Sequence, residues 1–147
     1  MSITKHWLFL SFGLLWRSFL LLQIYGLVFS LLIAKFLLSN SSVILIKPTL
    51  LYGSLALIIF IAQVGFKLNL LRAMLGKRLN LSQTQWRICA LSLACLFATM
   101  ATLNAVVAFS TSFDFWLYYK VFASPVLLVA GIFATSWVAI SRDSIHQ

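Results

Sequence analysis

Four polar side chains lie inside long apolar stretches of this sequence, where each would need a hydrogen-bonding or ionic partner. They are Gln23, Gln63, Asn104 and Lys120. A neutral amide in hydrocarbon commonly bonds to a neighbouring helix, although three amides could instead line a polar transport pathway. Lys120 follows two tyrosines, and its ammonium group could either extend to the membrane interface or hold an anionic lipid headgroup.

Residues that support acid–base, metal or thiol chemistry are scarce. The chain has no glutamate, and its other candidates are Asp114, Asp143, His6, His146, Cys89 and Cys95. The two cysteines lie six residues apart on a predicted helix and are too distant to form a disulfide. We expect no catalytic residues, no metal ion and no cofactor. The lack of a carboxylate deep in any apolar run argues against proton-coupled transport.

Charged residues divide the chain into four uncharged runs, the longest being the 26 residues between Arg87 and Asp114. A helix needs about 20 apolar residues to cross the hydrocarbon core. The sequence therefore predicts an all-α polytopic membrane protein, with one integral membrane domain covering residues 1–147. The predicted transmembrane helices are 18–38, 48–66, 86–110 and 117–141.

The ends of these spans carry local signals. Residues 5–16 are interpreted as an amphipathic or interfacial lead-in to the first span. One helix over 5–38 would be about 50 Å long, which is too long for one membrane crossing without a strong tilt or a break. Pro48 is expected in the first turn of the second span. The third should begin at a capping box, in which Ser82 and Gln85 exchange bonds with the backbone. Asp114 is the predicted N-cap of the fourth, and Pro125 should kink that helix or mark its first turns.

Composition and charge narrow the partners. The chain is 63% hydrophobic, and its formal net charge is +9. Because the cations follow the ends of apolar runs, we expect them to meet anionic lipid headgroups rather than nucleic acid.

The same cations predict the orientation, because short cytoplasmic loops carry an excess of Lys and Arg. With the 67–87 loop in the cytoplasm, eight cations lie inside and three outside. The inner set is Lys5, Arg17, Lys67, Arg72, Lys77, Arg78, Arg87 and Arg142, and the outer set is Lys35, Lys47 and Lys120. Both termini are therefore predicted to be cytoplasmic.

The 67–87 loop alternates leucine and methionine with cations. This pattern predicts a short cytoplasmic amphipathic helix that lies on the inner headgroups and ends near Gly76. A docking site for a membrane-protein partner is the alternative.

The third predicted span carries alanines at intervals of four and three residues, which are Ala94, Ala98, Ala101, Ala105 and Ala108. Small residues at this spacing allow another helix to approach closely, and Asn104 lies among them. We expect packing within the bundle, with a seam for a second protein as the alternative.

A set of motifs resembles the intracellular septation protein A family, the inner-membrane-spanning YciB type. Its residues are Met74, Leu75, Gly76, Lys77, Trp86, Trp116, Lys120, Val121 and Phe122. The family's usual acidic residue after the first motif is replaced here by Arg78. Family members are also longer by about one N-terminal span, so the resemblance implies a shortened or divergent member.

The resemblance implies a non-enzymatic protein of the bacterial inner membrane. Such a protein would support cell division, septation and cell-envelope homeostasis through contacts with protein partners and lipids. The alternatives are a small transporter or lipid-handling subunit, and an assembly subunit of a larger membrane complex.

Overall fold

The computed structural model describes residues 3–37, 43–75 and 81–143. Regular structure in these ranges is helical throughout. The elements are α1 (Ile3–Leu37), α2 (Val43–Val64), α3 (Leu70–Leu75), α4 (Gln83–Ser110), α5 (Phe113–Tyr118), a π-helical turn η1 (Tyr119–Ala123) and α6 (Ser124–Asp143). Four helical segments are long and apolar enough to cross a membrane, namely 7–32, 44–64, 83–110 and 113–141. The predicted all-α architecture with four spans is confirmed.

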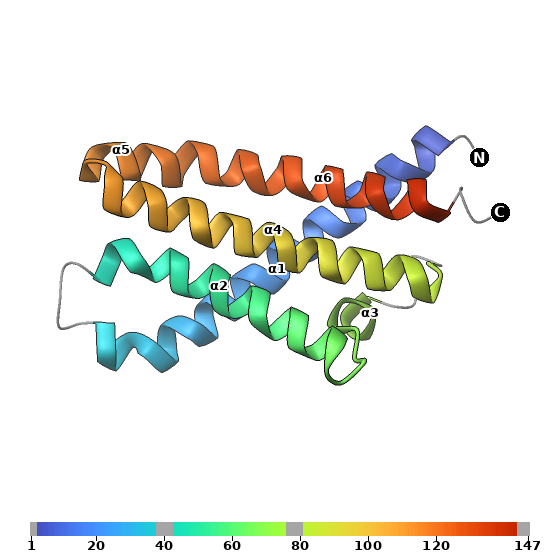
Figure 1. The fold of residues 1–147 in the computed structure, drawn as a ribbon, viewed down its shortest axis with the longest axis horizontal. Helices are drawn as coiled ribbons and strands as arrows, with labels where there is room; N and C mark the ends of the chain where they lie inside the picture. The colour runs from blue at the N-terminus through green and yellow to red at the C-terminus, as the bar shows by residue number, and fades with distance from the viewer. Residues whose placement is uncertain (1–2, 38–42, 76–80, 144–147) are drawn as a thin grey trace.

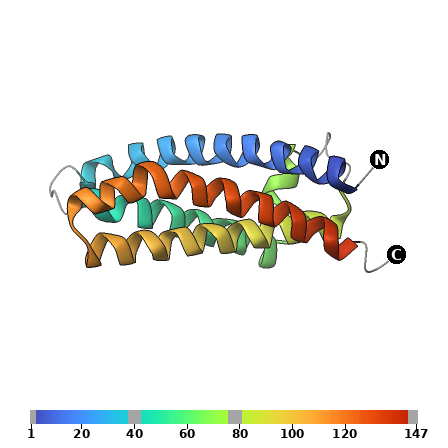
Figure 2. The same cartoon turned by 90° about the horizontal axis from the view of Figure 1, so that it is seen from above.

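The long helices form two layers. Helix α4 lies between α2 and α6 in one layer, and α1 crosses that layer on a diagonal (Figures 1 and 2). Small residues lie where helices of this layer meet. A Cβ atom built on Gly53 of α2 would make an ordinary contact with the Ala101 Cβ of α4 at 3.8 Å, whereas one built on Gly131 of α6 would overlap the Leu96 side chain.

For residues 5–16 the sequence left a tilted helix or a break open, and α1 takes the tilted course, so the lead-in is not a separate element (Figure 1). Helix α1 is one continuous helix, and its apolar span begins at Trp7. The reason is tertiary packing: Leu10 and Leu14 are buried, and the Trp7 indole N–H donates to the Phe133 carbonyl of α6 at 3.3 Å. The diagonal course of α1 accommodates a helix longer than one perpendicular crossing (Figure 1).

Helix α2 starts earlier than predicted. It begins at Val43, so Pro48 lies inside the helix rather than at the start of the span. A proline there removes one backbone donor and weakens the hydrogen-bond ladder. The carbonyl that loses its helical donor is that of Ile44, four residues before Pro48. The Asn104 amide of α4 donates to the next carbonyl, that of Leu45, at 3.2 Å, so α4 contacts the backbone of this turn.

The predicted amphipathic helix is present but short. Helix α3 has six residues, and Leu71 within it is 1% exposed and part of the core. The helix is therefore packed against the bundle instead of resting wholly on headgroups. The predicted capping box at the start of α4 is confirmed, since Ser82 and Gln85 exchange bonds of 2.9 and 3.1 Å.

The last span begins differently from the prediction. Ser112, not Asp114, is the N-cap of α5, because its hydroxyl accepts from the Phe115 N–H; Asp114 lies in the first turn. Pro125 follows directly after the π-helical turn and stands in the first turn of α6. Proline cannot supply an interior N–H, and the widened turn fits this local loss of the ladder.

Candidate functional site

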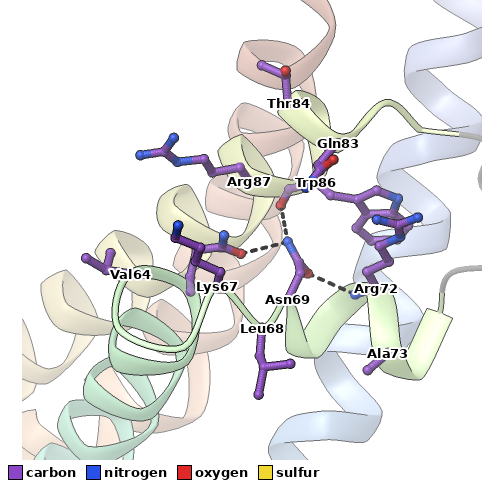
Figure 3. Close-up of a pocket in the computed structure, with 11 residues that line it drawn as sticks. Val64, Lys67, Leu68, Asn69, Arg72, Ala73, Gln83, Thr84, Trp86 and Arg87 are labelled. Carbon is purple, nitrogen blue, oxygen red and sulfur yellow. Dashed lines mark hydrogen bonds between the residues drawn. The ribbon is translucent and has the colours of Figure 1, made fainter.

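Asn69 ties three elements together at one end of the bundle. Its side-chain oxygen accepts from the Arg72 backbone N–H at 2.9 Å and so caps α3. Its amide nitrogen donates to the Gln63 side chain at 2.8 Å and to the Trp86 carbonyl at 2.7 Å (Figure 3). The end of α2, the start of α3 and the first turn of α4 are thus held by one residue.

A pocket of about 750 Å³ surrounds this residue. Three exposed cations line it: Lys67 from the turn after α2, Arg72 from α3 and Arg87 from α4 (Figure 3). The structure gives none of them a carboxylate partner among the side chains that it describes. We call these lining residues the basic pocket.

Lys67 has an unusual backbone. Its φ is 54°, in the left-handed region that residues other than glycine rarely occupy. The Leu68 N–H donates to the Ala62 carbonyl at 2.9 Å across the same turn. This turn lies between α2 and Asn69 and allows the Asn69 amide to reach the Trp86 carbonyl. The shape of the pocket therefore depends on the conformation of the turn.

The chemistry of the basic pocket is that of anion recognition. Guanidinium groups bind carboxylates and phosphates with charge-assisted hydrogen bonds. Its lining side chains, all within the described residues, include neither a carboxylate nor an imidazole nor a thiol. Among the described residues, no three His, Cys, Asp or Glu side chains are grouped to hold a metal ion.

Asn104 lies at the other end of the bundle and is 2% exposed. Its amide nitrogen donates to the Thr49 hydroxyl at 2.8 Å as well as to the Leu45 carbonyl, and its oxygen accepts from the Trp116 indole at 3.2 Å. It therefore connects α4 to both α2 and α5.

The three predicted amides do not meet in one place. Gln63 lines the basic pocket, whereas Gln23 and Asn104 line two adjoining cavities beside α1. Gln63 is therefore apart from the other two amides, and the three side chains do not line one continuous path.

The alanines of α4 divide between two environments. Ala94 and Ala101 are buried, Ala105 and Ala108 are half-buried, and Ala98 is exposed. Ala101 and Ala105 line a groove against α2, together with Gly53. Close contact with α2 thus involves only part of the predicted seam.

The residues of the family motifs are distributed over both ends of the helical bundle. The two tryptophans, Trp86 and Trp116, are each 2% exposed, whereas the side chains of Val121 and Phe122 are exposed. The Lys120 ammonium lies 4.9 Å from the centre of a Trp116 ring. Met74 and Leu75 belong to α3, and Gly76 and Lys77 lie outside the described residues.

Sequence reasoning did not single out Asn69. An Asn three residues before Arg72, at the start of an amphipathic stretch, is an N-cap signal that could have marked it. Its bonds to Gln63 and Trp86 join residues distant in sequence and carry no local signal.

The fold and site define the class: an all-helical membrane protein with four helices long and apolar enough to span, and a pocket lined by three cations at one end. The family model for intracellular septation protein A matches residues 6–144, and the chain belongs to that family. The predicted family is thereby confirmed.

Individual relatives agree. The chain is 34% identical over 125 residues to the inner membrane-spanning protein YciB of Cupriavidus metallidurans, covering 84% of this chain and 66% of the relative. It is 33% identical to the YciB protein of Ralstonia pickettii, with coverage of 84% and 63%, and 30% identical to that of Nitrosospira multiformis, with coverage of 88% and 71%. The chain spans slightly less than two thirds of the first two. No solved structure matches it.

Proposed function

We propose that this protein supports septation and envelope homeostasis without catalysing a reaction, by binding acidic segments of membrane-protein partners and anionic headgroups at the basic pocket. A role in septation fits the family, and the relatives are named as inner-membrane proteins. The observation that carries the proposal is the grouping of Lys67, Arg72 and Arg87 around Asn69.

Physical arguments support an anionic partner. Each cation near an anionic membrane surface contributes about 1 kcal/mol. Three cations on one wall repel each other and are most stable when an anion lies between them. Asn69 fixes the relative positions of α3 and α4, which carry Arg72 and Arg87. The loss of conformational entropy on binding a partner is smaller because these two helices are already held in place.

The basic pocket lies at the end of the bundle that is predicted to face the cytoplasm. The beginning of α1 and the end of α6 lie at the same end of the bundle as α3 (Figure 1). In the orientation that the charge distribution predicts, this end faces the cytoplasm and can meet cytoplasmic segments of division or envelope proteins.

The test is complementation by charge-neutral variants. Arg72→Gln and Arg87→Gln, singly and together, are expressed in cells that lack this protein, and cell length and membrane-fraction protein level are measured. We expect normal membrane levels with a persistent division or envelope defect. Lys5→Gln is the matched control, because Lys5 is an exposed cation outside the basic pocket.

Two results would contradict the proposal. Full complementation by the double variant at normal level would remove any role for the pocket. An equal defect in Lys5→Gln would assign the effect to overall charge rather than to this site.

A further inference from the structure

A long groove runs between α1 and the face formed by α2, η1 and α6. It consists of two adjoining cavities of about 590 and 530 Å³, which share Leu22, Pro48, Tyr52 and Lys120. From Phe12 to Ser30, both of which line it, the α1 wall is about 27 Å long at 1.5 Å per residue. This exceeds the depth of one leaflet, which is about 15 Å, half of the hydrocarbon core.

One part of the groove is apolar and partly aromatic. Phe12 and Phe19 of α1 line it and are 60% and 45% exposed, and Leu128 and Val129 of α6 form the opposite wall. These walls are suited to an acyl chain. The groove lies where α1 crosses the layer of α2, α4 and α6 on a diagonal (Figure 1).

The other part carries positive charge. Lys47 of α2 and Lys120 of η1 both line the groove at its α5 end. Lys47 lies four residues from the start of α2 and Lys120 seven residues from the start of α5, so they are about 6 and 10 Å inside their helical segments. Among the side chains that the structure describes, neither lysine has a carboxylate partner.

Local structure holds Lys120 in this position. Its ammonium lies 4.9 Å from a Trp116 ring centre, and Trp116 is itself fixed by its bond to Asn104. The π-helical turn that presents Lys120 is a type of distortion frequently found at functional sites. Close by, the Tyr52 and Ser124 hydroxyls lie 3.4 Å apart at the groove wall and can donate to an ester or phosphate oxygen.

We propose that this groove binds one anionic phospholipid of the surrounding bilayer. The phosphate lies between Lys47 and Lys120, and an acyl chain follows the aromatic wall toward Phe12. The site is separate from the basic pocket, which lies at the opposite end of the bundle. The inference does not depend on the function proposed for that pocket.

The experiment uses the purified full chain in mild detergent, with phosphatidylglycerol and phosphatidylcholine of identical acyl chains as probes. Native mass spectrometry measures the lipid that stays bound. We expect one phosphatidylglycerol to be retained in preference to phosphatidylcholine, and the double variant Lys47→Gln/Lys120→Gln to lower this preference at least about tenfold. Lys120→Arg should retain the preference, since it keeps the charge.

Controls separate this site from general charge and from annular lipid. Lys5→Gln, which lies outside the groove, should behave as wild type. Val129→Trp narrows the apolar wall and should reduce retention of phosphatidylglycerol while leaving Lys47 and Lys120 in place. Trp16 lines the groove and is 64% exposed, so bromine-labelled acyl chains should quench its fluorescence, measured by comparison with Trp16→Phe.

Equal retention of the two lipids by wild type would overturn the proposal and reduce the groove to a surface for annular lipid. An unchanged preference in the Lys47→Gln/Lys120→Gln variant would also overturn it. Loss of preference in Lys5→Gln would assign selectivity to net charge.

Discussion

The indole N–H of Trp116 donates to the side-chain oxygen of Asn104 at 3.2 Å, and both residues are 2% exposed. Through this bond the start of the last helical segment is joined to α4. Asn104 also bonds to Thr49 and to the Leu45 carbonyl on α2, so one amide connects three elements. This polar connection between three elements specifies how the helices align at the α5 end.

Replacement of Asn104 is the first prediction. Asn104→Leu should lower stability in detergent by about 1–3 kcal/mol, because three groups on two neighbouring elements lose their partner and each interhelical bond contributes about 0.6–1.7 kcal/mol. Thermal or denaturant unfolding measures the loss. Trp116→Phe removes the bond to the side-chain oxygen and leaves the other two bonds of Asn104 in place, but it also removes part of a buried ring, so its cost includes a loss of packing. A variant Asn104→Leu as stable as wild type would show that the network contributes no net stability.

The second prediction concerns the contact between α2 and α4. Ala101→Leu should destabilise the bundle by about 1–3 kcal/mol through overpacking, because Ala101 faces Gly53 at close range. Ala105→Leu, in the same groove but half-buried, should cost less. Ala98→Leu on the exposed face of the same helix is the matched control and should change stability little.

Thermal unfolding of these three variants in one detergent gives the comparison. Equal stability of the Ala101 and Ala98 variants would mean that the close contact with α2 does not restrict side-chain size. A larger loss for Ala98→Leu would instead point to a second protein or copy covering the exposed face.

These contacts show what the sequence could and could not specify. Uncharged runs of sufficient length predicted four spans correctly, because the bilayer sets a minimum apolar length. The capping box at Ser82 was predicted correctly because it is a local exchange of bonds within four residues. The start of the last span was wrong because Ser112 and Asp114 are both good N-caps, and local chemistry does not choose between them.

Two other features could not be predicted because they depend on contacts between residues that are distant in the sequence. Residues 5–16 join α1 because Trp7 packs against Phe133 and Trp137 of α6, about 130 residues later in the chain. The basic loop was recognised from its pattern of leucines and cations. Its organisation by Asn69 was not, because Gln63 and Trp86 come together only when α2 and α4 pack.

Lys67 provides a third prediction. Its left-handed backbone costs a non-glycine residue about 1–2 kcal/mol, whereas glycine loses about 0.5–1 kcal/mol of additional chain entropy on folding. Lys67→Gly should therefore leave stability unchanged or raise it by up to about 1 kcal/mol. If the lysine is retained for its charge, the same variant should weaken complementation of the division or envelope defect.

Lys67→Asn is the matched variant, because asparagine also tolerates the left-handed region and likewise removes the charge. Unfolding temperature and cell length are measured for both variants. Full complementation by the two of them would show that this lysine acts only as a turn residue. A marked loss of stability in Lys67→Gly would show that the side chain, not the backbone, holds the turn.

The last prediction concerns orientation. Eight cations against three favour a cytoplasmic location for the end that carries Lys67, Arg72 and Arg87. The start of α1 and the end of α6 lie at that same end of the bundle, which is what an even number of crossings requires (Figure 1). A reporter that is active only in the cytoplasm should therefore be active when fused after Gln147. The same reporter should be inactive when inserted at Asn40–Ser42, where a periplasmic reporter should be active instead. A C-terminal fusion that reports from the periplasm would show that the topology is the reverse of the predicted one. The basic pocket would then face the periplasm, where no cytoplasmic partner could reach it.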